Sequence, residues 1–158
     1  MAHDRLFGSR GPESKRVIRR IRQVASEEHA DGIALLDVEW FQRRLWTIEV
    51  DHAALQQSII RFVQAASEGG TLGAETSMLK ARGNAVHQAA HDLLVDAVGY
   101  YGLPFEGDIA AYSAEHAYYG PDYAQALSSG RYFARGVSLA GGTQEIQSVV
   151  AAKQALGL

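Results

Sequence analysis

The chain has 158 residues, 47% apolar and 21% charged, with a formal net charge of −3. This length and composition indicate one soluble globular domain and exclude a disordered chain. The absence of cysteine excludes disulfides and thiolate chemistry and fits the cytoplasm, the compartment we expect. A weakly acidic chain gives no reason to expect nucleic acid, and no apolar run approaches the roughly 20 residues of a membrane span.

The N-terminal region divides at residue 12. Residues 1–12 are polar and contain glycine, so we expect a flexible lead-in, with one helical domain over residues 13–158. The first helix is expected from about Pro12 to Glu28, because proline suits a first turn. Its apolar positions share one face: they are Val17, Ile18, Ile21 and Val24. We interpret the cations of SKRVIRRIRQ as the solvated face of this helix rather than an anion-binding patch.

Two long helices are predicted next, after a loop at HADGIALLD. The first of these helices ends at Ser67. Its inward-facing residues follow one another in steps of three and four, as at the packing seam of a helical bundle; this stripe is Leu45, Ile48, His52, Leu55, Ile59, Phe62 and Ala66. Trp40 and Trp46 flank this stripe and predict packing at an interface or at a helix end. The apolar seam and the two tryptophans exceed what a small bundle needs, so we expect self-association. The glycines of EGGTLGAE break the helix. The second runs from about Glu75 to Tyr101 with small inward residues toward its middle.

The C-terminal third predicts short helices. An irregular stretch at 107–123 leads into helices at Tyr123–Ser128, Arg131–Leu139 and Thr143–Leu156. In the last, we expect a buried face formed by Ile146, Val149, Val150 and Leu156. No strand of convincing alternation is found. The prediction is an all-α, antiparallel four-helix bundle built from the two long helices with the first and last.

The step Gly141-Gly142-Thr143 stands directly before the last helix. Glycines let the backbone approach a bound group closely, and the Thr143 hydroxyl can cap a helix whose N–H groups attract polar ligand edges. Composition alone favours the simpler interpretation, a turn followed by a capped helix.

His87 and His91 are four residues apart, a spacing that could hold zinc. HQAAH lacks the acidic second residue of a zinc protease motif, and no third ligand is evident. Packing or surface histidines are therefore the favoured interpretation, and no metal site is expected. No serine lies in a nucleophile-elbow context, and no phosphate loop is present.

The stretch SLAGGTQEIQSVVAAKQALGL at 138–158 resembles the C-terminal signature of the acyl-CoA dehydrogenase family, in which Gly-Thr-x-Glu-Ile-Gln opens the last helix. Two other stretches agree. SMLK at 77–80 opens the penultimate long helix as in family members, and VGYYG at 98–102 stands where the family has a glycine-rich turn. The resemblance covers roughly residues 36–158.

The resemblance implies a four-helix C-terminal domain, FAD as cofactor, and oxidation of the Cα–Cβ bond of an acyl-CoA thioester. It implies that FAD lies across an interface in a homo- or hetero-oligomer of acyl-CoA dehydrogenase-like subunits. The residues expected to contact FAD are Gly141, Gly142, Thr143, Glu145 and Gly99.

The sequence also departs from the family. Many members carry their catalytic base, a glutamate, immediately before the Gly-Thr pair, where this chain has Gly141, so no catalytic residue is assigned. A glutamine that often faces the flavin aligns with Asp96. The family's N-terminal helical domain and central β-domain have no counterpart here. Two interpretations stay open: an FAD-contacting part of a dehydrogenase, inactive alone, which we favour, and a non-catalytic helical module that keeps only the fold and interface.

Overall fold

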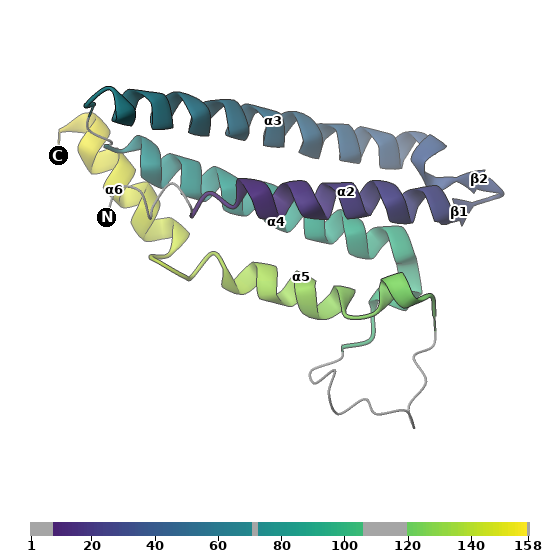
Figure 1. The fold of residues 1–158 in the computed structure, drawn as a ribbon. Helices are drawn as coiled ribbons and strands as arrows, with labels where there is room; N and C mark the ends of the chain where they lie inside the picture. The colour runs from purple at the N-terminus through teal and green to yellow at the C-terminus, as the bar shows by residue number, and fades with distance from the viewer. Residues whose placement is uncertain (1–7, 71–72, 106–119, 158) are drawn as a thin grey trace.

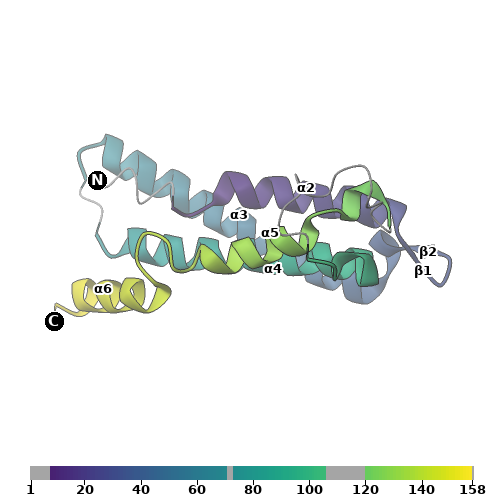
Figure 2. The same cartoon turned by 90° about the horizontal axis from the view of Figure 1, so that it is seen from below.

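The computed structural model describes residues 8–70, 73–105 and 120–157. Helices α2 (Gly11–Glu27), α3 (Glu39–Ser67), α4 (Glu75–Val98) and α5 (Leu127–Gly136) lie side by side in alternating directions (Figures 1 and 2). This confirms the predicted all-α, antiparallel four-helix bundle. The fourth position is taken by α5 rather than by the last helix. That helix, α6 (Gln144–Leu156), lies at the end of the bundle where α4 begins.

Short elements join these helices. They are the 3-10 turns η1 (Leu35–Asp37), η2 (Gly99–Gly102) and η3 (Asp122–Ala124). The helix predicted at Tyr123–Ser128 is the 3-10 turn η3 followed by the start of α5, and the helix predicted at Arg131–Leu139 is the rest of α5, which ends at Gly136. Residues 1–7 of the predicted lead-in, and 107–119 of the predicted irregular stretch, lie outside the described residues.

The segment predicted as a loop at 29–37 contains a small hairpin, which corrects the expectation of no strand. Strand β1 (His29–Ala30) pairs antiparallel with β2 (Ile33–Ala34). Asp31 and Gly32 form the turn with φ of 53° and 81°. Positive φ at both central residues matches the right-handed twist of paired strands, and Asp-Gly is a strong signal for such a turn. The hairpin reverses the chain between α2 and α3.

The main hydrophobic core lies between α2, α3 and α4. The expected inward residues of α4 are all buried, and the small side chains of Ala90 and Ala97 let the neighbouring helices approach. The stripe on α3 is buried from Leu45 to Leu55 and half-buried at its C-terminal end. Trp40 and Trp46 are about half exposed.

Toward the end where α2 and α4 begin, the interior becomes polar. His52 on α3 is buried, and its Nε2 lies 2.9 Å from the carbonyl oxygen of Gly11. Ser14 on α2 is buried, with its Oγ 3.3 Å from Nδ1 of His87 on α4. Since buried polar groups need partners, these contacts fix how α2 sits on α3 and α4.

The chain before α2 packs directly on α4. Ser9 is buried, and α2 begins at Gly11, two residues before the predicted domain boundary. Gly83 in the middle of α4 makes this contact possible, because a Cβ there would lie 1.9 Å from the carbonyl oxygen of Ser9. Glycine usually weakens a helix interior, so this glycine is explained by the close approach of residue 9.

The expected buried face of α6 is not buried. Ile146, Val149 and Leu156 are 56%, 49% and 71% exposed, and α6 has no buried residue among those described. The reason is that α6 turns its small residues toward α4. They line a hollow of about 360 Å³ opposite Ser77, Met78 and Ala81. The members from α6 are Gln147, Ser148, Ala151, Ala152 and Ala155.

We predict that Gly83→Ala destabilises the domain. In a helix without tertiary contacts, alanine would be favoured over glycine by about 1 kcal/mol. Here the added Cβ collides with the Ser9 backbone, so we expect a loss of roughly 1–3 kcal/mol in the free energy of unfolding. Gly136→Ala is the matched control, since nothing lies within 4 Å of a Cβ at that position. Urea unfolding that shows Gly83→Ala to be as stable as the unmodified chain would contradict the prediction.

Candidate functional site

The Gly-Gly-Thr step forms a tight turn between α5 and α6. Gly141 and Gly142 have φ of 67° and 96°, a conformation that favours glycine. A Cβ on Gly142 would also lie 2.7 Å from Nε2 of Gln147. That side-chain amide donates to the Gly141 carbonyl oxygen at 3.2 Å. Both glycines are therefore required by the backbone shape of the turn, and the space that their Cβ atoms would take lies next to Gln147 and Lys80.

Thr143 caps α6, as the sequence predicts. Its hydroxyl oxygen accepts from the backbone N–H of Ile146 at 3.3 Å. Glu145 lies exposed in the first turn. Its own backbone N–H and the Thr143 hydroxyl hold the pKa of the Glu145 carboxyl below its usual value. The start of α6 thus presents an ionised carboxylate and a capped helix end beside the two glycines.

Lys80 of α4 binds the inner side of the turn. Its side chain is buried, and Nζ donates to the carbonyl oxygens of Ala140, Gly141 and Gly142 at 2.6, 2.7 and 2.6 Å. Burial, and then the charge of Arg10, lower the pKa of the Lys80 ammonium.

This contact decides which way the turn presents its backbone. In a trans peptide the N–H points opposite to the carbonyl oxygen, and the described chain has no cis bond. The N–H groups of residues 141–143 therefore point away from Lys80 and out of the bundle. The turn offers donors on its outer surface and no side chain from its glycines.

Lys80 is the first residue of a polar stripe that runs along α4 in steps of four. Gln88 donates to the Ala134 carbonyl at 3.2 Å, and Asp92 pairs with Arg131 and Arg135 of α5. Asn84 lies between Lys80 and Gln88; it is 1% exposed, and its side-chain amide has no hydrogen-bond partner among the described residues. The stripe fixes α5 and the following linker on α4, so it also sets the position of the turn.

The sequence did not reveal this role of Lys80. SMLK was noted only as a point of resemblance, although a signal was present. Polar residues at 80, 84, 88 and 92 share one face of an otherwise apolar helix. A polar stripe at that spacing predicts that a polar segment packs against it.

Gly99, the remaining predicted FAD contact, is not brought to the turn. It ends α4 with φ of 55°, at the opposite end of that helix from Lys80. Nineteen residues at about 1.5 Å each put these positions roughly 28 Å apart along the helix. Asp96, the residue aligned with the family's flavin-facing glutamine, is paired with Arg44 of α3 at 2.7 Å. The predicted contacts therefore form two separate groups.

The two histidines lie together without further ligands. The rings of His87 and His91 are 4.7 Å apart, edge to face. In residues 8–70, 73–105 and 120–157, no group of three or more His, Cys, Asp or Glu side chains could hold a metal ion. Within those same ranges, no helix is long and apolar enough to cross a membrane.

Comparison with known families decides the assignment. Residues 12–156 match the family model described as acyl-CoA dehydrogenase, C-terminal domain. The chain belongs to the acyl-CoA dehydrogenase family. The match begins well before the stretches that carried the sequence resemblance and includes α2. No curated protein matches this acyl-CoA dehydrogenase domain by sequence.

Solved structures share the fold of this acyl-CoA dehydrogenase domain at low identity. An acyl-CoA dehydrogenase from Geobacillus kaustophilus has a TM-score of 0.76 and 15% identity, covering 98% of this chain and 36% of that one. The ChsE4–ChsE5 complex from Mycobacterium tuberculosis has a TM-score of 0.67 and 23% identity, and the match covers 92% of this chain and 35% of that one. The structure named PigA with FAD and proline has a TM-score of 0.69 and 16% identity, and the match covers 92% of this chain and 33% of that one. The domain spans about a third of the length of these chains.

We predict that Lys80→Met loosens the turn. Methionine keeps the length of the stem but removes the ammonium, so the Ala140 and Gly142 carbonyls lose their donor and the Gly141 carbonyl keeps only Gln147. Hydrogen bonds from charged donors contribute about 1.5–3 kcal/mol, so we expect a loss of that order in the free energy of unfolding. Hydrogen exchange at residues 141–147 should speed up more than at the centre of α4.

Lys153→Met on exposed α6 is the control and should stay within about 0.5 kcal/mol of the unmodified chain. Unchanged exchange at the turn in Lys80→Met would show that Lys80 does not hold it.

Proposed function

We propose that this domain supplies FAD contacts and an oligomer interface to a flavin-dependent acyl-CoA dehydrogenase, which forms the α,β-double bond of an acyl-CoA thioester. The observation that carries the proposal is the bare Gly-Gly-Thr turn held on Lys80, in a chain of this family. The fold relative named with FAD supports the cofactor for the family fold.

The residues of the turn fit a flavin in three respects. Glycine without a Cβ at 141 and 142 admits a flat ring system close to the backbone. The outward N–H groups donate to carbonyl or phosphate oxygens. Glu145 stays ionised near neutral pH, because its pKa is lowered, and accepts hydrogen bonds from hydroxyl groups. When bound, FAD supplies the redox chemistry, and the contribution of the chain is to position it.

The proton removed from the acyl-CoA in this reaction must be accepted by a group other than residue 141. Gly141 stands where many members carry the glutamate base, and a glycine accepts no proton. We therefore expect the chain alone to turn over no acyl-CoA. Gly141→Glu should not restore turnover, since one carboxylate does not supply the remaining substrate pocket. Measurable dehydrogenation of an acyl-CoA by the unmodified chain would contradict this.

The separation of Gly99 from the turn favours an oligomer. One group of contacts lies at each end of α4, so two domains arranged head to tail would each bring a turn to the partner's Gly99 end. The exposed residues of α6 and the two tryptophans offer apolar surface for such an assembly. The ChsE4–ChsE5 relative is named as a complex, which makes an unlike partner subunit a second form of the same proposal.

A second candidate function is a non-catalytic subunit that keeps only the fold and the interface. Gly141 is the observation that favours it. Under this alternative, the turn would have no need to admit a cofactor, and FAD would not be retained by any assembly that contains the chain.

The test is flavin retention through gel filtration, read from the visible absorption spectrum. We expect FAD to elute with an oligomer of the chain, and not with a monomer. Gly142→Val and Gly99→Val add branched side chains beside the start and at the end of α4, and each should abolish retention. Because valine is strained at the positive φ of both positions, urea unfolding of each variant must show that the domain stays folded under the conditions of gel filtration.

Mixing these two variants separates shared sites from single-chain sites. In a mixed dimer one site would carry both changes and the other would carry neither, so a random mixture should regain about a quarter of the flavin. If each site lay within one chain, the mixture would regain none. An unmodified chain that retains no flavin, alone or with its partner subunit, would contradict the proposed function.

A further inference from the structure

A pocket between α2, α4 and α5 lies apart from the Gly-Gly-Thr turn. Its volume is about 320 Å³. Its lining combines apolar walls with titratable side chains: the apolar residues are Val17, Leu94, Ala126, Leu127 and Gly130, and the titratable ones are Glu13, Arg16, Arg20, His87 and His91. Apolar walls with a few convergent polar groups are the usual composition of a small-molecule site.

The two histidines lie against each other in this pocket. His87 is 5% exposed, and Ser14 lies 3.3 Å from its Nδ1. In the described part of the chain, nothing hydrogen-bonds to its Nε2 or to the ring of His91. The backbone of α5 comes close over His91, because a Cβ on Gly130 would lie 3.4 Å from Cε1 of that ring. Imidazole nitrogens without partners are left facing a cavity.

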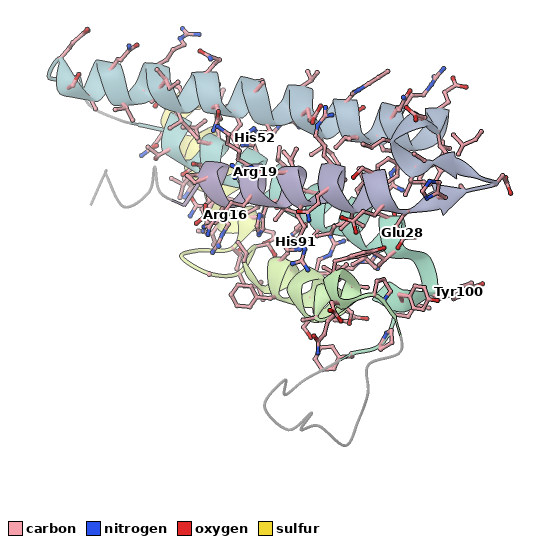
Figure 3. All side chains as sticks on the ribbon, turned by 45° about the vertical axis from the view of Figure 1, so that its right-hand side comes forward. Arg16, Arg19, Glu28, His52, His91 and Tyr100 are labelled. Atoms are coloured by element: carbon pink, nitrogen blue, oxygen red, sulfur yellow. The ribbon has the colours of Figure 1, made fainter. Side chains whose placement is uncertain are left out.

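The charge of the pocket is unbalanced toward positive. Arg16 has no ion-pair partner among the described residues, and Arg20 donates only to the backbone oxygen of Tyr123, at 2.8 Å. Glu13 is the single carboxylate in the lining. In Figure 3, Arg16 and His91 lie on the side of the bundle where α5 passes beside α2. Two guanidinium groups thus face one carboxylate, beside two imidazoles that can each take up a proton.

We propose that this pocket binds a compact organic acid, with its carboxylate against Arg16 and the two imidazoles and its apolar body against Val17, Leu94 and Leu127. Arginine suits this role, because its planar fork matches the geometry of a carboxylate. The cations interpreted from the sequence as a solvated face would then divide into two groups. Arg16 and Arg20 serve the pocket, and Arg19, exposed and outside the lining, does not.

Ligand binding is coupled to protonation of the histidines. Burial lowers the pKa of His87 to about 4, aided by His91 and Arg10 and opposed by Glu13. Burial also lowers the pKa of His91, with Asp92 raising it and Arg20 lowering it. No charged side chain from α5 lines the pocket. A bound carboxylate favours the imidazolium forms, so binding takes up protons and strengthens as the pH falls toward 5.5.

The test is a titration of the chain followed by NMR of the imidazole protons. The probes are benzoate, inorganic phosphate, and benzyl alcohol as an uncharged control of the same shape. We expect benzoate to shift both histidines, with a dissociation constant roughly threefold lower at pH 5.5 than at pH 7.5. Arg16→Gln should weaken benzoate at least about fivefold, while Arg19→Gln should leave it unchanged. Both changes are at exposed positions and spare the core.

Each other outcome overturns the proposal. Equal binding of benzyl alcohol would mean an apolar pocket without charge recognition. Phosphate binding more tightly than benzoate would mean an inorganic anion site. Equal weakening of benzoate binding by Arg16→Gln and Arg19→Gln would mean non-specific attraction to α2. If the histidine signals do not shift with about 20 mM benzoate, roughly the weakest binding of interest, the pocket is not a binding site.

Discussion

The contact between the Lys80 ammonium and the carbonyls of residues 140–142 is the constraint on which the candidate site depends. A buried ammonium without a carboxylate partner is costly, and here three backbone oxygens replace its hydration. The contact stabilises the linker as well as the ammonium, because the turn with two glycines at positive φ has few other donors for its carbonyl oxygens. Lys80 thereby converts a flexible connection into a surface of defined shape, with its donors facing outward.

The same helix organises the rest of the molecule. One face of α4 contributes to the hydrophobic core with α2 and α3, and another holds α5 through Gln88 and Asp92. At its centre Gly83 accepts the backbone of Ser9. Helix α6 also lies on α4 through its small residues, but its branched residues remain exposed. The domain therefore has a firmly packed centre and one end with exposed apolar surface.

Much of the fold follows from periodicity and from glycine. The seam of α3, its last residue and the cap at Thr143 were predictable, because each rests on local spacing or local hydrogen bonding. Helix α4 ends at Val98, three residues before the predicted Tyr101, because the chain tightens there into the 3-10 turn η2. The hairpin at 29–34 was missed, although Asp31-Gly32 signals it. The burial of α6 was predicted wrongly, because its sequence pattern shows which residues are apolar but not which side meets α4. Lys80 was missed for a similar reason, since its partners lie some sixty residues away.

The length of α4 has a consequence for how the sequence can vary. Adding or removing one residue between Lys80 and Gly99 would turn one end of the helix by about 100° relative to the other and move it about 1.5 Å. The two halves of the cofactor site that we propose to be shared between domains would then no longer face each other. Insertions in the half-exposed C-terminal part of α3 carry no such penalty. Selection on cofactor binding would thus act on residue number in α4, even where it tolerates changes of side chain.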